Sequence, residues 1–161
     1  MADAVLQSCV TEILARIDAY TFPDNGNGAG TWTVNGSHVN PTEISKLKEP
    51  RAFLYINPVP GAIEMENVQQ WLVRQEMTAQ LRMARIKNQY QTAIKILPYW
   101  HMCLAQNTSG TIDPLLNGYA FNQNFRDGQV VFGNAKTPFI DLFISFEVEY
   151  TYAIDDPTSV I

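Results

Sequence analysis

Two long stretches of the chain alternate between apolar and polar residues, and both predict β-strands. In residues 68–86 the apolar side chains fall mostly at odd positions, and in residues 139–153 they fall mostly at even positions. Because successive side chains of a strand point to opposite faces, a period of two indicates one buried face and one wet face. On the second stretch the polar residues expected on the wet face are Ser145, Glu147, Glu149 and Thr151.

The first helix is predicted from apolar residues that recur at spacings of three and four between Val5 and Ile17. Asp3 is its expected N-cap. It should end near Tyr20, because Pro23 and the glycine-rich run that follows cannot continue a helix. Its polar residues, expected on the opposite, solvated side, are Gln7, Glu12, Arg16 and Asp18.

A second helical segment is predicted within residues 88–104, again from spacings of three and four. Pro98 interrupts it, which favours a kink or a second short helix with the proline in its first turn. The residues that define its predicted core-facing side are Tyr90, Ala93, Ile94, Leu97, His101 and Leu104.

The remaining segments predict shorter elements. Residues 31–34 and 51–57 read as strands, and residues 64–72 as a helical or irregular lead-in to the long strand. Residues 115–125 and 129–132 flank Arg126-Asp127-Gly128, and Asp-Gly between strand-like runs is a hairpin signal.

Together these elements predict an α+β fold, with a mainly antiparallel sheet and two helices packed on one of its faces. The chain of 161 residues is expected to form a single domain, 1–161. A flexible loop insertion is expected around residues 24–48, and an extended C-terminal tail at residues 153–161.

The charge pattern argues against several classes of protein. The formal net charge is −5, and the only basic-leaning stretch, residues 51–86, is too weak for a binding patch. Binding to nucleic acid by bulk charge is therefore not expected, since phosphates need clustered Lys and Arg. We also expect no membrane span and no secretory signal.

No catalytic, cofactor or metal site is predicted. Cys9 and Cys103 read as small buried apolar residues of a protein that folds in a reducing cytoplasm, and their separation in space is left open. His38 is expected in an exposed loop and His101 partly buried with its polar atoms satisfied. Glu147 and Glu149 could form a glycosidase-like pair, but on a strand they indicate a solvated or intersubunit face.

A metal site and a phosphate-binding loop are also not predicted. Asp155 and Asp156 are adjacent carboxylates without a histidine, which makes a poor metal site. The glycine-rich run at residues 24–30 has no preceding strand and no following Lys-Ser/Thr, so it does not fit a phosphate-binding loop. The sequence therefore predicts a protein that is not an enzyme.

The order of elements resembles that of a known family. An N-terminal amphipathic helix (VLQSCVTEILARIDAY) is followed by a strand with prolines (RAFLYINPVPG) and a long alternating strand (WLVRQEMTAQLRMARI). A central helix (NQYQTAIKILPYW) and a final alternating strand with an aspartate-proline tail (LFISFEVEYTYAIDDP) complete the pattern. This order resembles the tail terminator, or tail-completion, proteins of long-tailed bacteriophages, from whose compact members the stretch 24–48 departs.

The resemblance implies a structural virion protein that is assembled in the host cytoplasm. Such a protein forms a ring, usually a homohexamer, at the head-proximal end of the phage tail. There it ends the tail tube, joins it to the head-side connector, and lets DNA pass through its lumen without specific binding. The low charged fraction, 17%, suits a surface that is largely interface, and the acidic balance predicts an acidic lumen that repels phosphates.

Interface roles are therefore the roles predicted for individual residues. The contact surfaces expected are the 24–48 loop, the 110–137 region and the 153–161 tail, whose removal should weaken assembly without unfolding the chain. The candidate interface residues are Phe143, Ser145, Glu147, Glu149, Asp155, Asp156, Arg126 and Asp127. The alternatives are another neck or tail-tube subunit, a small cytoplasmic α+β enzyme, or a ligand-binding module near Trp71 and Trp100.

Overall fold

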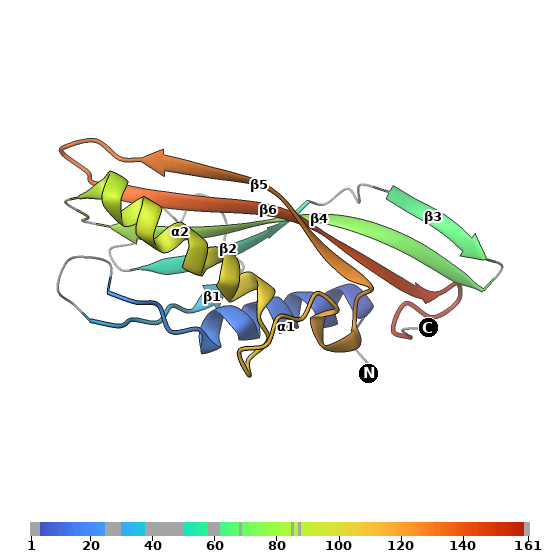
Figure 1. Ribbon diagram of the computed structural model, residues 1–161. Coiled ribbons are helices and arrows are strands. Elements are labelled where there is room, and N and C mark those ends of the chain that lie inside the picture. The colour runs from blue at the N-terminus through green and yellow to red at the C-terminus, as the bar shows by residue number, and fades with distance from the viewer. Residues whose placement is uncertain are drawn as a thin grey trace.

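The computed structural model has an α+β fold built on one mixed, mostly antiparallel sheet (Figure 1). The structure describes residues 4–24, 30–37, 50–57, 62–67, 69–84, 86 and 88–159. The segments 25–29 and 38–49 lie outside these residues, as do most of the predicted 24–48 loop, His38 and Asp3.

Six strands form the sheet within the described residues, in the order β1-β2-β4-β6-β5, with β3 paired to β4. Only the β1–β2 pair is parallel, and every other pair is antiparallel, as predicted. The strands are β1 (Gly36–Ser37), β2 (Arg51–Ile56), β3 (Ala62–Asn67), β4 (Gln70–Ala84), β5 (Asn122–Phe132) and β6 (Phe139–Ala153).

The β4–β6 pair is the central ladder of the sheet. All 15 residues of β4 have partners in β6, from Gln70 opposite Ala153 to Ala84 opposite Phe139. At about 3.4 Å per residue the ladder is about 50 Å long. Both long alternating stretches are therefore confirmed as strands.

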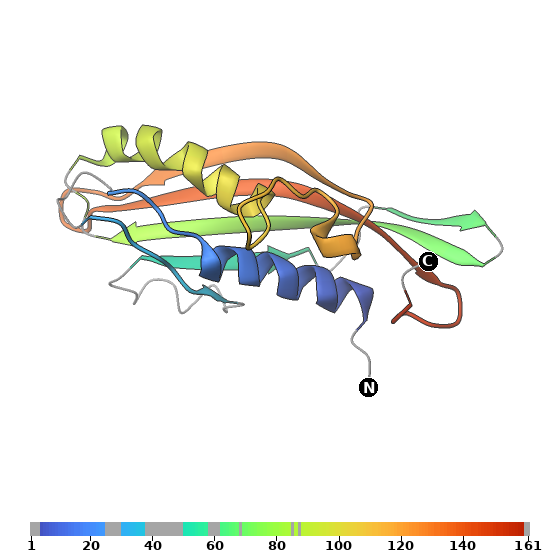
Figure 2. The same ribbon diagram turned by 60° about the horizontal axis from the view of Figure 1, so that its bottom comes forward.

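The other edge of β4 is shared by two shorter strands, β2 along residues 77–82 and β3 along residues 70–74. The segment 64–72 is thus an antiparallel hairpin, and the predicted helical or irregular lead-in is wrong. Figures 1 and 2 show β3 and the paired parts of β4 and β6 projecting beyond both helices. We call this projection the arm; it comprises residues 62–67, 70–74 and 149–153.

The two faces of the ladder differ in character. We call the face with the odd residues of β4 and the even residues of β6 the core face, and the opposite one the polar face. Core-face side chains such as Met77, Leu81 and Phe146 belong to the same hydrophobic cluster as buried residues of both helices. Buried helical members of that cluster are Val5, Cys9, Val10, Ile13, Ile17, Ala93, Ile96, Trp100, Cys103 and Leu104.

Helix α1 spans Val5–Ala19, close to the predicted range. Its N-cap is Ala4, which makes no side-chain cap, so the prediction of Asp3 is wrong. Arg16 is also buried rather than solvated, because the chain after the second helix covers it and supplies an acidic partner, Asp113.

Helix α2 spans Gln89–Ala105 and continues through Pro98 as one helix. Tyr90 and Ile94 are 70% and 58% exposed, so the predicted buried side is wrong for these two residues, whereas Ala93 and Leu104 are buried as predicted. The buried side is instead centred on Ile96 and Trp100. This helix carries apolar residues on all its sides, so their periodicity alone does not predict which side faces the core. Burial of the large Trp100 indole determines that side. Neither helix in the described ranges is long and apolar enough to cross a membrane.

Two further predictions fail locally. Residues 31–34 are not a strand; Trp32 makes an isolated bridge to Phe22, and their rings stack at 4.4 Å. Arg126-Asp127-Gly128 is not a hairpin turn, because β5 runs continuously from Asn122 to Phe132 with an irregularity between Phe125 and Gly128. Because the residues on both sides of Arg126 and Asp127 pair with β6, the Asp-Gly sequence forms a β-bulge and not a turn.

Candidate interaction surfaces

The polar face brings together several of the interface residues predicted from sequence. The register places Ser145 opposite Thr78, and their hydroxyl oxygens are 3.1 Å apart. It also places Glu149 opposite Arg74, with 3.6 Å between carboxylate oxygen and Nε. Phe143 lies on the same face, half-buried. Alternation predicted the face of each residue, and the register supplies the partners.

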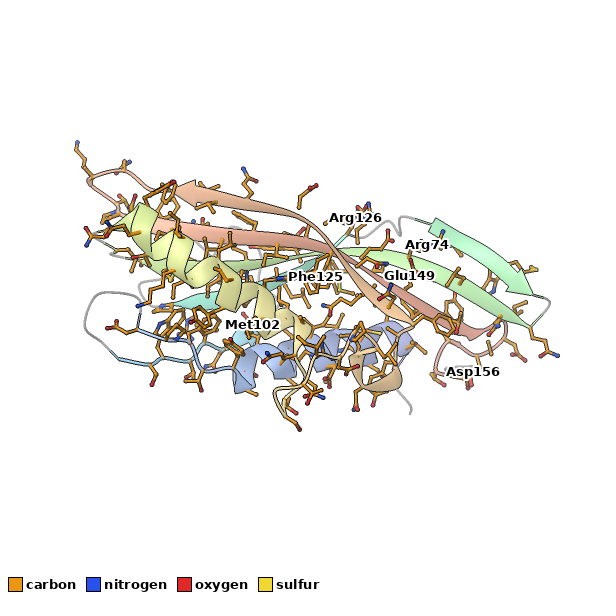
Figure 3. All side chains as sticks on the ribbon, viewed as in Figure 1. Arg74, Met102, Phe125, Arg126, Glu149 and Asp156 are labelled. Atoms are coloured by element: carbon orange, nitrogen blue, oxygen red, sulfur yellow. The ribbon has the colours of Figure 1, made fainter. Side chains whose placement is uncertain are left out.

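Arg126 reaches this face from the bulge in β5. Its guanidinium donates to Glu147 at 2.7 Å and lies 3.7 Å from Glu76. Glu76 and Glu147 are direct cross-strand partners, and like charges in that position repel. Arg126 therefore neutralises a pair of carboxylates that the register forces together. Figure 3 shows Arg126, Arg74 and Glu149 from three different strands near the middle of the sheet.

A second ion pair lies nearer the other end of the ladder. Arg82 donates to both carboxylate oxygens of Asp141, at 2.7 and 2.6 Å, and its guanidinium stacks over the Phe139 ring at 4.5 Å. The hydrogen bonds to Asp141 raise the pKa of Arg82. Bidentate pairs of this kind are strong and rigid. The polar face thus satisfies much of its own charge, which makes it a structural ladder rather than an open charged binding surface.

The C-terminal residues form a separate structure. The Asp156 carboxylate accepts hydrogen bonds from the Thr158 amide, the Thr158 hydroxyl and the Ser159 hydroxyl, and these bonds lower its pKa. Asp155 is exposed beside it. Asp156 lies away from Arg126 (Figure 3), so the candidate interface residues do not form one site.

This tail also binds the body of the protein. Pro157 accepts a hydrogen bond from the Val5 amide at the start of α1, and the Ile154 amide donates to Gln69. The tail was predicted to be extended, but its described residues fold back on themselves and onto the body. Across the described ranges, no three His, Cys, Asp or Glu residues form a group that could hold a metal ion.

An apolar groove runs between α2 and β5. His101 and Phe125 meet edge to face at its middle, with ring centroids 4.4 Å apart. His101 is exposed, against the expectation that it is partly buried. On either side of this ring pair lies a hollow. The first, of about 330 Å³, is lined by Leu97, Pro98, His101, Phe125, Arg126, Asp127, Gly128 and Ile144. The second, of about 290 Å³, is lined by His101, Ala105, Ile112, Pro114, Gln123 and Phe125. We call the two hollows together the α2–β5 groove.

Gln123 is the unusual residue of the second hollow. The residue is only 5% exposed, yet neither the nitrogen nor the oxygen of its side-chain carboxamide has a hydrogen-bond partner. A buried carboxamide without partners costs free energy. Sequence reasoning missed the groove, because its walls come from α2, β5 and the segment between them, and no local pattern shows that these pack side by side.

A second apolar surface lies on the arm. Ile63 and Met65 of β3 are 53% and 56% exposed. The register places them opposite Val73 and Trp71, so they extend the core face. The arm projects beyond the helices (Figure 2), and these two side chains therefore have no helix packed over them.

The two cysteines are buried and free, as predicted for small apolar residues. Burial raises the pKa of Cys9 to about 12 and also raises that of Cys103. Neither thiol is a ready nucleophile, since the reactive form is the thiolate.

Comparisons with known proteins do not identify a family. No family model matches this chain, and no curated protein matches it.

Proposed function

We propose that this chain is a structural virion protein that assembles into a ring at the head-proximal end of a long phage tail. It ends the tail tube there and joins it to the head-side connector. The observation that supports this role best is the presence of two different unpartnered apolar surfaces on one chain, the arm with Ile63 and Met65 and the α2–β5 groove.

Two different surfaces favour a head-to-tail interface, and head-to-tail contacts generate rings when the rotation between subunits closes. A surface that pairs with itself would instead give a two-fold dimer. The number of subunits in the ring depends on the rotation at the interface, and the family resemblance favours six.

The sheet suits such an assembly. We infer that α1 and α2 both cover the core face, which leaves the polar face to the internally paired ladder of Arg126, Glu147 and Arg82. A rigid central ladder of about 50 Å holds the arm and the groove at fixed positions in each subunit, so every copy presents the same geometry to its neighbours. In this proposal the net charge of −5 keeps DNA from adhering in the lumen.

Assembly of the purified chain tests the proposal. Light scattering over a range of concentrations should show a shift towards one defined oligomer, and negative-stain micrographs should show rings. A chain that stays monomeric at every concentration, without added tail or connector components, would contradict the ring. Cryo-electron microscopy of the intact particle should then place the subunit between tail tube and connector, around an acidic lumen.

A matched pair of variants connects the ring to the arm. Met65→Glu puts a charge on the exposed apolar surface of the arm and should prevent assembly. Gln7→Glu adds the same charge at an exposed position of α1 and should leave assembly unchanged. Circular dichroism of both variants checks that the fold is retained.

A further inference from the structure

We propose that the α2–β5 groove receives strand β3 from a second copy of this chain, with the Ile63 and Met65 side chains in its two hollows. The inference rests on the self-association proposed above and specifies the two surfaces that meet. It also assigns Gln123 a role in binding.

The side chains and the hollows correspond in number and spacing. Ile63 and Met65 are two positions apart on one strand face, a separation of about 7 Å. The two hollows lie on either side of the same ring pair, His101 and Phe125, which forms a wall of both. Their volumes of about 330 and 290 Å³ accommodate one aliphatic side chain each, since a cavity of about 150 Å³ holds a benzene ring.

The strand edges correspond as well. Among the described strands, β5 is the last in the sheet order and β3 pairs only with β4, so each has one edge without a strand partner. A strand added to such an edge satisfies its main-chain groups. The bulge after Phe125 limits regular pairing to residues 122–125, and the loop of the bulge itself lines the first hollow.

Gln123 supplies an independent indication of a ligand. Its carboxamide offers donors on nitrogen and an acceptor on oxygen, and neither atom has a partner although the residue is only 5% exposed. A peptide group offers one donor and one acceptor and so complements a carboxamide. The main chain of an incoming strand therefore complements Gln123, and because both polar atoms are covered in the single chain, the side chain must turn into the hollow for the two to meet.

The incoming strand must come from another copy. Within one chain the order β3-β4-β6-β5 places two strands of the central ladder between β3 and β5, and the arm projects away from its own groove (Figure 1). Each copy then gives its arm to one neighbour and receives an arm from the other. This contact uses a different surface on each partner, as ring closure requires.

Cysteine cross-linking tests the contact directly. Copies with Met65→Cys are mixed with copies carrying Ile112→Cys, which lies in the second hollow and is 62% exposed, and a short bismaleimide is added. Covalent dimers should form in the mixture and not with either variant alone. The native Cys9 and Cys103 are buried and should not react. Copies with Tyr90→Cys, at the far end of α2 and 70% exposed, are the control and should not cross-link to Met65→Cys.

A second variant tests the role of Gln123. Gln123→Leu removes both unpaired atoms, so it should raise the melting temperature of the monomer and at the same time weaken self-association at least tenfold. A simple folding defect would lower both. Gln123→Glu should weaken association as well, and without any gain in stability.

The outcomes separate this inference from the proposed ring. Rings that form without the mixed cross-link, or that form equally well with Gln123→Leu, would overturn the arm-in-groove contact and leave the ring proposal standing. A chain that remains monomeric at all concentrations would overturn both. Cross-linked dimers within rings, lost when Ile63→Glu is added to the Met65→Cys copies, would support both.

Discussion

Arg16 of α1 and Asp113, in the loop after α2, form an ion pair of 2.8 Å across 97 positions of sequence. The Arg16 side chain has no exposure at all, and it also binds Glu12 at 3.1 Å and the Leu104 carbonyl at 3.1 Å. One buried cation thus joins α1, the end of α2 and the loop that follows. Arg16 therefore fixes the C-terminal end of α1 relative to the C-terminal end of α2. It also holds the loop whose residues Ile112 and Pro114 line the second hollow.

Removing Asp113 should be strongly destabilising. Asp113→Ala leaves a buried guanidinium with one carboxylate fewer, and breaking such a pair costs about 3 kcal/mol. The free energy of unfolding from urea titrations measures the loss. Arg16→Met combined with Glu12→Gln and Asp113→Asn removes the three charges together and keeps an acceptor for the Leu115 amide, which Asp113 binds in the native chain. That triple variant should recover most of the stability; a loss equal to that of Asp113→Ala would show that the buried charge is not the cause.

Removing Arg126 should expose the repulsion between Glu76 and Glu147. Arg126→Gln leaves these direct cross-strand partners without the cation between them, and we expect a loss of about 1–2 kcal/mol in thermal or urea unfolding. Adding Glu147→Gln should restore stability. Asp127→Asn, at the exposed neighbouring position, is the control and should change stability by less than about 0.5 kcal/mol.

Substitution by alanine should have very different effects on stability at Gly128, which lies in β5, and at Gly133, which directly follows it. A Cβ on Gly133 would collide with the Thr137 carbonyl oxygen and lie 2.7 Å from the Phe139 amide nitrogen, whereas on Gly128 the nearest atom is at 3.6 Å. Gly133→Ala should therefore lower stability by about 2 kcal/mol, because backbone atoms of the turn must move. Gly128→Ala should be nearly neutral. Similar melting temperatures for the two variants would contradict the tight packing of the turn.

Alkaline solutions should unfold this protein early. Burial raises the pKa of Cys9 from 9.0 to about 12 and also raises that of Cys103. Above pH 9 the unfolded chain releases thiol protons that the folded chain keeps, so stability is complete below pH 9 and falls as pH rises. The slope is up to about 1.4 kcal/mol per pH unit for each thiol. Urea midpoints between pH 7 and about 11 should show this fall, and Cys9→Ala with Cys103→Ala should flatten it.

The elements that sequence predicted correctly are those whose pattern is long. β4 and β6 alternate over 15 residues each, so a few exceptions such as Gln75 on the buried face do not obscure the period. β3 was missed because Ile63 and Met65 are its only clearly apolar positions, and an alternation of four residues fits several structures. The short run Ile63-Glu-Met-Glu was nevertheless the signal that could have found it.

The other failures came from contacts that no local pattern reports. Arg16 occupies a polar position of an amphipathic helix and is covered only because Asp113 folds over it. The Asp127-Gly128 turn signal was overridden by pairing of Phe125 with Phe146 and of Gly128 with Ile144. The groove escaped notice for the same reason, since Gln123 shows no sign in sequence that its carboxamide will be buried without a partner.

For the candidate interface residues too, the sequence pattern predicted the strand face but not the contacts. Alternation correctly assigned Ser145, Glu147 and Glu149 to one face of a strand, but the expectation that this face is wet is wrong at Glu147 and Thr151, which are buried. It could not reveal that Arg126 neutralises Glu147, because that contact needs both the strand register and the bulge. Asp155 and Asp156 were predicted as interface residues because they lie in the C-terminal tail, and the fold places that tail against the start of α1.

The central ladder has a consequence for how the chain reaches its fold. β4 and β6 are neighbours in the sheet, yet α2 and β5 lie between them in the chain, so the ladder forms only after a long loop has closed. Folding dominated by such non-local pairing takes milliseconds to seconds, compared with microseconds for local helices. β6 follows β4, α2 and β5 in chain order, and during synthesis one edge of β4 stays unpaired until β6 leaves the ribosome. Strands β2, β3 and β4 are therefore the segment of the nascent chain most in need of protection from aggregation.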